Sequence, residues 1–554
     1  MSAAPALADL APGAYLAARS AAVNGDFDAA ARNFTQALAR DPSNPELLEN
    51  AAVSMLALGD LERAEVIAKQ IVDLDQRSQV AHMILVARAA SVEDYDTVLQ
   101  RVSSDRGVGP LVDGLLRSWS LVGTGDMAAA LDSFDAVGEE PGLQGFALYH
   151  KALALALVGD LEGADAIFAM PEAGALRQTR RGAMAHIEVL SQLGRSDDAL
   201  MMLEESFGSD LDPRLRDMRT TLQAGGKLAF TTITTARDGM AEVFFTVASA
   251  LRNEASEDYT LLYSRAAEHL RPDHIDTLLL SAGLLEQMER YSLATKTYAR
   301  VSPDNPAYHA AELGRAEALR RAGKPDAAIE VLQALTKSHG DLPIVHSSLG
   351  DALRSQEDYE GAVAAYDAAL ALFEEELRSQ WFVYYARGIS HERLQAWPQA
   401  EADFRKALEL NPDQPQVLNY LGYSLVEKQI KLDEALGMIE RAVAAQPDSG
   451  YIVDSLGWVL FRLGRYEDAV GHMERATELM PVDPIVNDHL GDVYWSVGRY
   501  LEAEFQWKRA LSFVDFGDAS QEADPDRIRR KLEVGLDQVL SEEGAEPLRK
   551  PDDG

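Results

Sequence analysis

The residue patterns that could support catalysis are incomplete in this sequence. Gly225-Gly226-Lys227 resembles the end of a phosphate-binding loop, but Leu228 occupies the position where serine or threonine must hold magnesium. The segment Gly422-Tyr-Ser-Leu-Val is not a nucleophile elbow, because the second glycine of that motif is absent. We therefore expect a protein that is not an enzyme, with no catalytic residue and no cofactor.

Metal-ligand spacing is also missing. The chain has no cysteine, which excludes disulfides, thiolate zinc sites and cysteine nucleophiles. The 11 histidines include no His-x-x-x-His pair, and His269 and His274 are five residues apart, on different faces of a helix. We expect no metal site.

The charge of the chain narrows the class of partner. The 554 residues include 52 basic and 89 acidic side chains, for a net charge of −37. A surface of this sign repels phosphate backbones and anionic lipid headgroups, so we expect neither nucleic-acid nor membrane-surface binding. No apolar run approaches the roughly 20 residues that span a bilayer. A basic or amphipathic protein is the favoured partner.

A short repeated unit must position any binding residues. Glycines recur with gaps of 38, 34, 35 and 34 residues, at Gly350, Gly388, Gly422, Gly457 and Gly491. Alanines keep the same register between them, and prolines follow at Pro412, Pro447 and Pro481. The spacing resembles the tetratricopeptide repeat (TPR), most strongly from about residue 343 to 515. Small residues allow two helices to cross closely, and each helical hairpin buries its apolar face only against its neighbours.

The predicted fold is an all-α TPR solenoid, a right-handed superhelix of about a dozen helix-turn-helix repeats with a C-terminal capping helix. We expect a degenerate N-terminal array over 11–205 and a C-terminal array over 241–515. Between them, residues 206–240 contain Gly225-Gly226 and the run Phe-Thr-Thr-Ile-Thr-Thr, which break the repeat. This irregular joint is interpreted as an extended connector or a distorted hairpin, and a flexible loop is an equal alternative.

The chain is expected to end in a cap and a tail. Residues 525–541 have one apolar stripe, which suits a helix that closes the end of the solenoid. The stripe consists of Ile528, Leu532, Leu536, Val539 and Leu540. Four basic residues, Arg527, Arg529, Arg530 and Lys531, are expected to point away from it. Residues 542–554 are expected to form a disordered tail.

A second stripe lies one step around each first helix of the C-terminal repeats. In TPR proteins these positions line the concave groove, and aromatic anchors beside polar side chains suit peptide binding. The candidate protein-binding residues are Tyr385, Asn419, Tyr423, Asp454, Trp458, Phe461, Asp488, Asp492 and Trp495. The alternative is that the aromatic residues only fill gaps between hairpins. The three aspartates should repel the acidic C-terminal tails that some co-chaperone repeats bind.

The C-terminal block is similar to one bacterial subgroup in particular. The resemblance rests on Asn419-Tyr-Leu-Gly-Tyr-Ser-Leu, Leu432-Asp-Glu-Ala-Leu, Asp454-Ser-Leu-Gly-Trp-Val-Leu and Asp488-His-Leu-Gly-Asp-Val-Tyr-Trp. These runs resemble large TPR proteins of Gram-negative bacteria that are often exported as outer-membrane lipoproteins. One such relative is an adaptor that activates a periplasmic carboxyl-terminal processing protease and presents cell-wall hydrolases to it.

The resemblance implies a non-catalytic periplasmic scaffold whose partners are a processing protease or cell-wall hydrolases. The sequence departs from the subgroup in two features, because it has neither a lipidation cysteine nor a signal peptide at Met1. The alternative hypothesis is therefore a cytoplasmic assembly scaffold or chaperone-like TPR protein. Neither the partner's identity nor the oligomeric state follows from the sequence.

Overall fold

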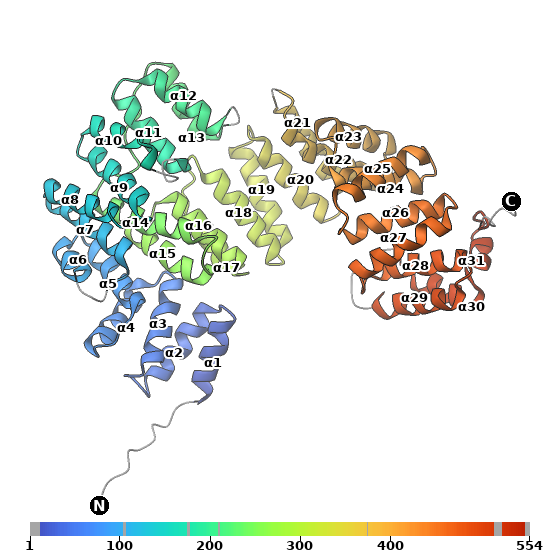
Figure 1. The fold of residues 1–554 in the computed structure, drawn as a ribbon, viewed down its shortest axis with the longest axis horizontal. Coiled ribbons are helices and arrows are strands. Elements are labelled where there is room, and N and C mark those ends of the chain that lie inside the picture. Colours follow the sequence, from blue (N-terminus) through green and yellow to red (C-terminus); the bar gives the residue numbers. More distant parts are fainter. Residues whose placement is uncertain are drawn as a thin grey trace, which may run out of the picture. The chain divides into compact units, whose positions relative to one another are not determined.

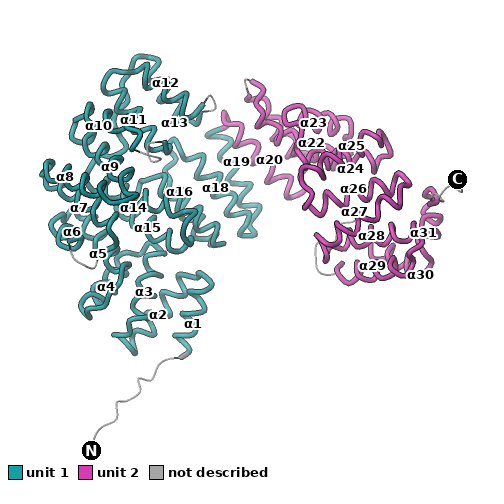
Figure 2. The backbone as a smooth tube through the Cα atoms, in the orientation of Figure 1, with its two compact units in different colours: residues 1–339 teal, residues 340–554 magenta. Residues whose placement is uncertain are grey.

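The computed structural model describes residues 12–103, 107–173, 178–208, 211–373, 375–514 and 523–548, which form 31 α-helices and no strand (Figure 1). The chain divides into two compact units, residues 1–339 and 340–554 (Figure 2). None of the described helices is long and apolar enough to cross a membrane. The predicted all-α fold of stacked helical hairpins is confirmed.

Within its described residues, unit 1 contains nineteen of these helices and the 3₁₀ turn η1. They are α1 (Pro12–Val23), α2 (Phe27–Leu38), α3 (Pro45–Ala57), α4 (Leu61–Asp73), α5 (Gln79–Ser91), α6 (Tyr95–Val102), α7 (Pro110–Thr124), α8 (Met127–Gly138), α9 (Gln144–Leu157), α10 (Leu161–Phe168), η1 (Pro171–Ala173), α11 (Arg180–Gln192), α12 (Ser196–Phe207), α13 (Pro213–Gln223), α14 (Ala236–Leu251), α15 (Glu257–Leu270), α16 (Ile275–Gln287), α17 (Tyr291–Tyr298), α18 (Tyr308–Arg321) and α19 (Pro325–Ser338).

Unit 2 continues the same alternation of first and second helices. Its elements are α20 (Pro343–Ser355), α21 (Tyr359–Ala371), η3 (Arg378–Gln380), α22 (Trp381–Arg393), α23 (Trp397–Leu410), α24 (Pro415–Glu427), α25 (Leu432–Ala445), α26 (Gly450–Arg462), α27 (Tyr466–Leu479), α28 (Pro484–Ser496), α29 (Tyr500–Phe513), α30 (Pro525–Val534) and α31 (Leu536–Glu542).

Local sequence explains where the helices begin. The second helices α2, α4, α8 and α10 each follow an aspartate whose side chain accepts a backbone N–H of the first turn. Such caps satisfy backbone donors that have no partner within the helix. The first helices α3, α24 and α28 instead have proline in the first turn, where no backbone donor is lost.

The repeated alanines occupy the packing positions that the sequence predicts. Ala400, Ala435, Ala469 and Ala503, one on each of the second helices α23, α25, α27 and α29, are fully buried. They belong to one core that runs from α22 to α31. Because each hairpin buries its apolar face against the next, this core is continuous from α22 onward, while α20 and α21 contribute to a separate cluster.

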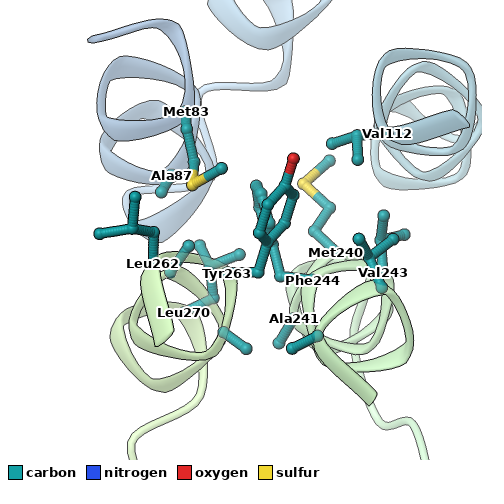
Figure 3. Packing of buried hydrophobic residues seen from close by; sticks show 14 of the residues in the cluster. Met83, Ala87, Val112, Met240, Ala241, Val243, Phe244, Leu262, Tyr263 and Leu270 are labelled. Atoms are coloured by element: carbon teal, nitrogen blue, oxygen red, sulfur yellow. The ribbon is translucent and has the colours of Figure 1, made fainter. Parts of the chain in front are cut away.

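Unit 1 folds back on itself. Helices α14 and α15 pack against α3, α5, α7 and α9, the first helices of four earlier hairpins. Figure 3 shows Met83 from α5 and Val112 from α7 facing Phe244 of α14 and Tyr263 of α15. All four side chains are buried in one core. The inner face of these earlier hairpins is therefore filled by the chain's own later helices.

Buried polar groups hold the fold-back in place. Arg181 of α11 forms ion pairs with Glu242 of α14 at 2.7 Å and with Asp276 of α16 at 2.8 Å. Tyr149 of α9 donates a hydrogen bond to Glu242 at 2.9 Å, and His274 lies 3.2 Å from the same carboxylate. Burial alone would raise the pKa of Glu242, but Arg181 and His274 hold it far below its ordinary value. Glu242 is thus an ionised tie between four helices.

The predicted joint at 206–240 lies inside unit 1, whereas the boundary between the two compact units falls between residues 339 and 340 of the sequence. Within the joint, α13 is followed by a non-helical segment that leads into α14. The buried carboxylate of Glu188 accepts hydrogen bonds from the backbone N–H groups of Thr231 and Thr232, at 2.9 and 3.2 Å. Ile233 is also buried. The threonine-rich run is consequently an extended connector that side-chain contacts fix in place.

The C-terminal end differs from the expectation in two details. Gly535, with a φ of +82°, separates the predicted capping helix into α30 and α31. Glycine adopts such a positive φ without steric strain, so the helix can end at this residue. Part of the predicted disordered tail is structured, because Glu542 belongs to α31 and Leu548 packs against the core of unit 2. Residues 549–554 of that tail lie outside the described residues.

Candidate protein-binding groove

The first helices of unit 2 place six of the nine predicted groove residues in two cavities. Asn419, Tyr423 and Asp454 line an open pocket of about 340 Å³ on α24, α26 and α28. Trp458, Phe461 and Asp492 line a second cavity of about 230 Å³, which α30, α31 and the residues after them close on one side. The structure thus gathers these positions as the register of the repeat predicts.

The open pocket combines polar groups with an aromatic wall. Its lining includes Glu392, Glu427 and Asp454 together with the rings of Tyr420 and Tyr423. Asn419 is 8% exposed, and no described residue donates a hydrogen bond to its buried Oδ1. A buried acceptor without a donor is costly, so this amide favours a ligand with an N–H group.

Asp454 is paired within the chain. His489 Nδ1 of α28 lies 3.1 Å from one carboxylate oxygen of Asp454 and 3.2 Å from the other. Burial lowers the pKa of His489, but the carboxylates of Asp454, Asp488 and Asp492 more than offset this, so the pKa lies above its ordinary value. The pair links two consecutive repeats at the floor of the groove.

The aromatic residues have packing roles of their own. Trp458 stacks on His489 with 3.9 Å between ring centroids and on Phe461 with 4.9 Å. Its Nε1 donates a hydrogen bond to Glu427 at 3.0 Å. Tyr385 packs among Trp381, Phe404 and Tyr420, where burial raises its pKa to about 12. Tyr385 lines neither of the two cavities described above.

The acidic end of the stripe is occupied by the chain itself. Lys531 of α30 is fully buried, and its Nζ donates to Asp488 at 2.8 and 2.9 Å and to Asp492 at 2.6 and 2.8 Å. The same ammonium group lies 5.8 Å from the ring centroid of Trp507. Burial raises the pKa of Asp488 above its ordinary value. Lys531 offsets part of this rise, and the neighbouring Asp492 carboxylate adds to it.

Trp495 is also covered by the capping segment. Its Nε1 donates a hydrogen bond to Asp537 of α31 at 2.8 Å. A Cβ at Gly535 would come within 2.3 Å of its ring, so only glycine allows this close approach.

The expectation that Lys531 points away from the apolar stripe is wrong. Lys531 follows Ile528 by three residues, which places it about 60° around the helix, on the same face.

The sequence analysis did not predict the contacts of two residues beside the groove, Lys531 and His489. Lys531 was assigned to the solvent side because it is basic, although its spacing of three residues from Ile528 indicates the apolar face. His489 is not among the predicted groove residues. Its position directly after Asp488, in a repeat whose predecessor carries Asp454 in the groove, was the available signal.

Family comparisons agree with the hairpin architecture. Models described as tetratricopeptide repeat match residues 23–87, 279–343, 313–376, 381–414, 428–484 and 455–512. This chain belongs to the tetratricopeptide-repeat proteins, whose repeats generally serve as protein-interaction scaffolds and are typically non-catalytic. A TPR repeat-containing protein of Pseudomonas aeruginosa is 30% identical over 186 residues, which cover 33% of this chain. The match spans only 30% of that relative's length.

Solved structures with similar folds are more distant. The APC/C hetero-tetramer Cut9–Hcn1 contains a chain that is 14% identical, with 95% of this chain and 96% of that chain covered and a TM-score of 0.39. YrrB, described as a TPR protein with an unusual peptide-binding site, is 22% identical over 33% of this chain and 93% of its own, with a TM-score of 0.28.

Proposed function

We propose that this chain is a non-catalytic adaptor that holds a partner protein in the groove of unit 2. The observation that carries the proposal is the open pocket on α24, α26 and α28, where Asn419, Tyr423 and Asp454 meet. The inner face of the earlier hairpins in unit 1 is filled by α14 and α15, which directs partner binding to unit 2.

The partner we propose is a periplasmic carboxyl-terminal processing protease, or the substrates that the adaptor delivers to it. Support comes from the motif resemblance of residues 419–495 to the envelope TPR proteins of Gram-negative bacteria. The net charge of −37 adds a preference for a basic or amphipathic partner surface. The proposed location is accordingly the periplasm.

A reconstitution with purified proteins tests the adaptor role. The full chain should co-elute with the processing protease of the same organism and accelerate its cleavage of a cell-wall hydrolase. Tyr423→Ala combined with Tyr451→Ala removes two rings from the pocket wall and should abolish both effects. Phe505→Ala removes an exposed ring on α29 and should leave both unchanged. Equal activity of the groove variant would contradict the assignment.

Fractionation of the native cell tests the location. An antibody against the chain should detect it in the osmotic-shock fraction together with a periplasmic marker. Recovery only with cytoplasmic markers would rule out the envelope role and favour the alternative, an assembly scaffold or chaperone-like TPR protein in the cytoplasm.

A further inference from the structure

A segment of the chain itself occupies the acidic end of the groove and shows which kind of side chain binds there. A short helix, α30, lies across the last repeat and inserts one lysine between two carboxylates, with Nζ–oxygen distances of 2.6–2.9 Å. Ile528 from the same helix and Leu536 from α31 are buried alongside. The group bound between the carboxylates is therefore a primary ammonium group, flanked by aliphatic side chains on a helix.

We infer that the open pocket one repeat earlier binds a lysine side chain on an amphipathic helix of the partner protein. The inference rests on the proposed function and specifies the partner's chemistry. Asp454 occupies the same repeat position as Asp488, 34 residues earlier in the chain. Stacked repeats present equivalent positions side by side along one face, so the pocket continues the surface that α30 covers.

The charge of the open pocket suits a cation. Its lining contains four carboxylates, those of Glu392, Glu427, Asp454 and Asp483. Two basic side chains, Arg393 and Lys428, also contribute to the lining. Arg393 lies 3.9 Å from Glu392, and Lys428 lies over the ring of Trp397, with its Nζ 4.9 Å from the centroid. Arg462, which does not line the pocket, lies 3.3 Å from Glu427. The lining itself holds four carboxylates against Arg393, Lys428 and His489, and this small excess of negative charge suits a single ammonium group.

Hydrogen bonding and shape point to the same ligand. Asn419 offers an acceptor that no described residue satisfies, and a lysine ammonium group carries three donors. The pocket of about 340 Å³ is also lined by Tyr423, Tyr451 and Val486. These rings and methyl groups can cover the four methylenes of a lysine and the aliphatic residues one turn away on its helix.

A direct test uses the intact chain and a synthetic peptide copy of its residues 524–548 as the probe. The peptide carries Lys531 and the apolar stripe of the capping segment. Fluorescence anisotropy with a labelled peptide should show saturable binding to the intact chain. A peptide with Lys531→Met should bind at least about tenfold more weakly, and added salt should weaken binding of the original peptide.

Variants of the chain locate the site. Asn419→Leu and Asp454→Asn should each weaken peptide binding by about three- to tenfold. Asp413→Asn alters an exposed carboxylate outside the pocket and should have no effect. Because Asp454→Asn could disturb folding through His489, Asn419→Leu provides the independent reading, and circular dichroism of each variant verifies the helix content.

Three results would overturn the inference. They are no peptide binding, equal binding of the lysine and methionine peptides, and binding that Asn419→Leu and Asp454→Asn leave unchanged. Hydrogen exchange on ¹⁵N-labelled chain adds a fourth, since loss of protection in its own residues 525–542 would show that the peptide replaces α30 at Asp488 instead. If the protease complex forms but is insensitive to Asn419→Leu, the adaptor role stands and the lysine pocket does not.

Discussion

At the scale of single residues, the main tertiary interaction at the end of unit 2 is a buried ion triad. Lys531 neutralises two buried carboxylates that would otherwise repel each other. A buried ion pair adds little net stability compared with apolar packing, but removal of one partner leaves an uncompensated charge. Lys531 therefore fixes where α30 docks more than it adds to the total stability.

Lys531→Met should lower the free energy of unfolding of unit 2 by about 3–5 kcal/mol, because Asp488 and Asp492 lose their cation. Chemical denaturation followed by circular dichroism measures the change. Arg529→Met, in the same helix, removes an exposed partner of Asp526 and should cost less than about 1 kcal/mol. The triple variant with Asp488→Asn and Asp492→Asn should recover part of the loss. An equal cost for both single variants would contradict the buried triad.

His489 predicts a pH dependence of stability. Its folded-state pKa is above the unfolded value of about 6.5. The charged imidazole therefore contributes fully below pH ~6.5, and the contribution is lost as pH rises through the folded pKa. The difference in Tm between the wild type and Asp454→Asn should shrink as pH rises above 6.5. Differential scanning calorimetry tests this, and a difference that grows over the same range would refute the assignment.

At the scale of elements, the decisive feature is the return of α14 and α15 over the first helices of earlier hairpins. The close approach of α14 to α7 depends on Gly239, where a Cβ would lie 2.2 Å from the Trp119 ring. Trp119 is fully buried and donates its Nε1 hydrogen to His150 Nδ1 at 3.1 Å. The ring therefore has little room to move aside.

Gly239→Ala should destabilise unit 1 by about 1–2 kcal/mol, because the overlap with Trp119 outweighs the gain in helix propensity. Gly283→Ala is the matched control, since no atom lies within 4 Å of its added Cβ. That variant should be more stable than the wild type by about 0.5–1 kcal/mol. Urea denaturation compares the two, and a stabilising Gly239→Ala would show that α14 does not pack closely on α7.

At the scale of the whole molecule, the large negative net charge determines how stability depends on salt. A net charge of −37 on 554 residues produces self-repulsion in the folded state, which salt screens over a Debye length of about 10 Å at 0.1 M. Most of the surface ion pairs are solvent-exposed and contribute little, so their loss in salt is a smaller effect. The chain should be more stable at moderate ionic strength than at low ionic strength.

Raising NaCl from about 0.02 M to 0.3 M should therefore raise the melting temperature, by about 1 °C for each ~1 kcal/mol of repulsion relieved in a chain of this length. Thermal circular dichroism provides the measurement, and sodium sulfate at matched ionic strength separates screening from anion-specific effects. A lower Tm at 0.3 M would mean that specific ion pairs outweigh the net repulsion.

Sequence alone determined the helical hairpins of residues 343–515, since the period of small and apolar residues reports contacts between neighbours in the chain. The same period placed Asn419, Tyr423 and Asp454 on one face, and the pocket confirms that they lie together. Whether partners occupy this groove stays a prediction.

Only the tertiary structure decided which faces are already covered. The apolar face of α14 has the same pattern whether it packs on the next hairpin or on α7, so the fold-back over the earlier hairpins left no local signal. Lys531 is likewise indistinguishable by residue type from a solvated lysine until Asp488 and Asp492 are seen around it. Contacts between distant segments depend on shape and charge that meet only after folding, and these contacts leave the pocket beside Asp454 open while the neighbouring site is filled.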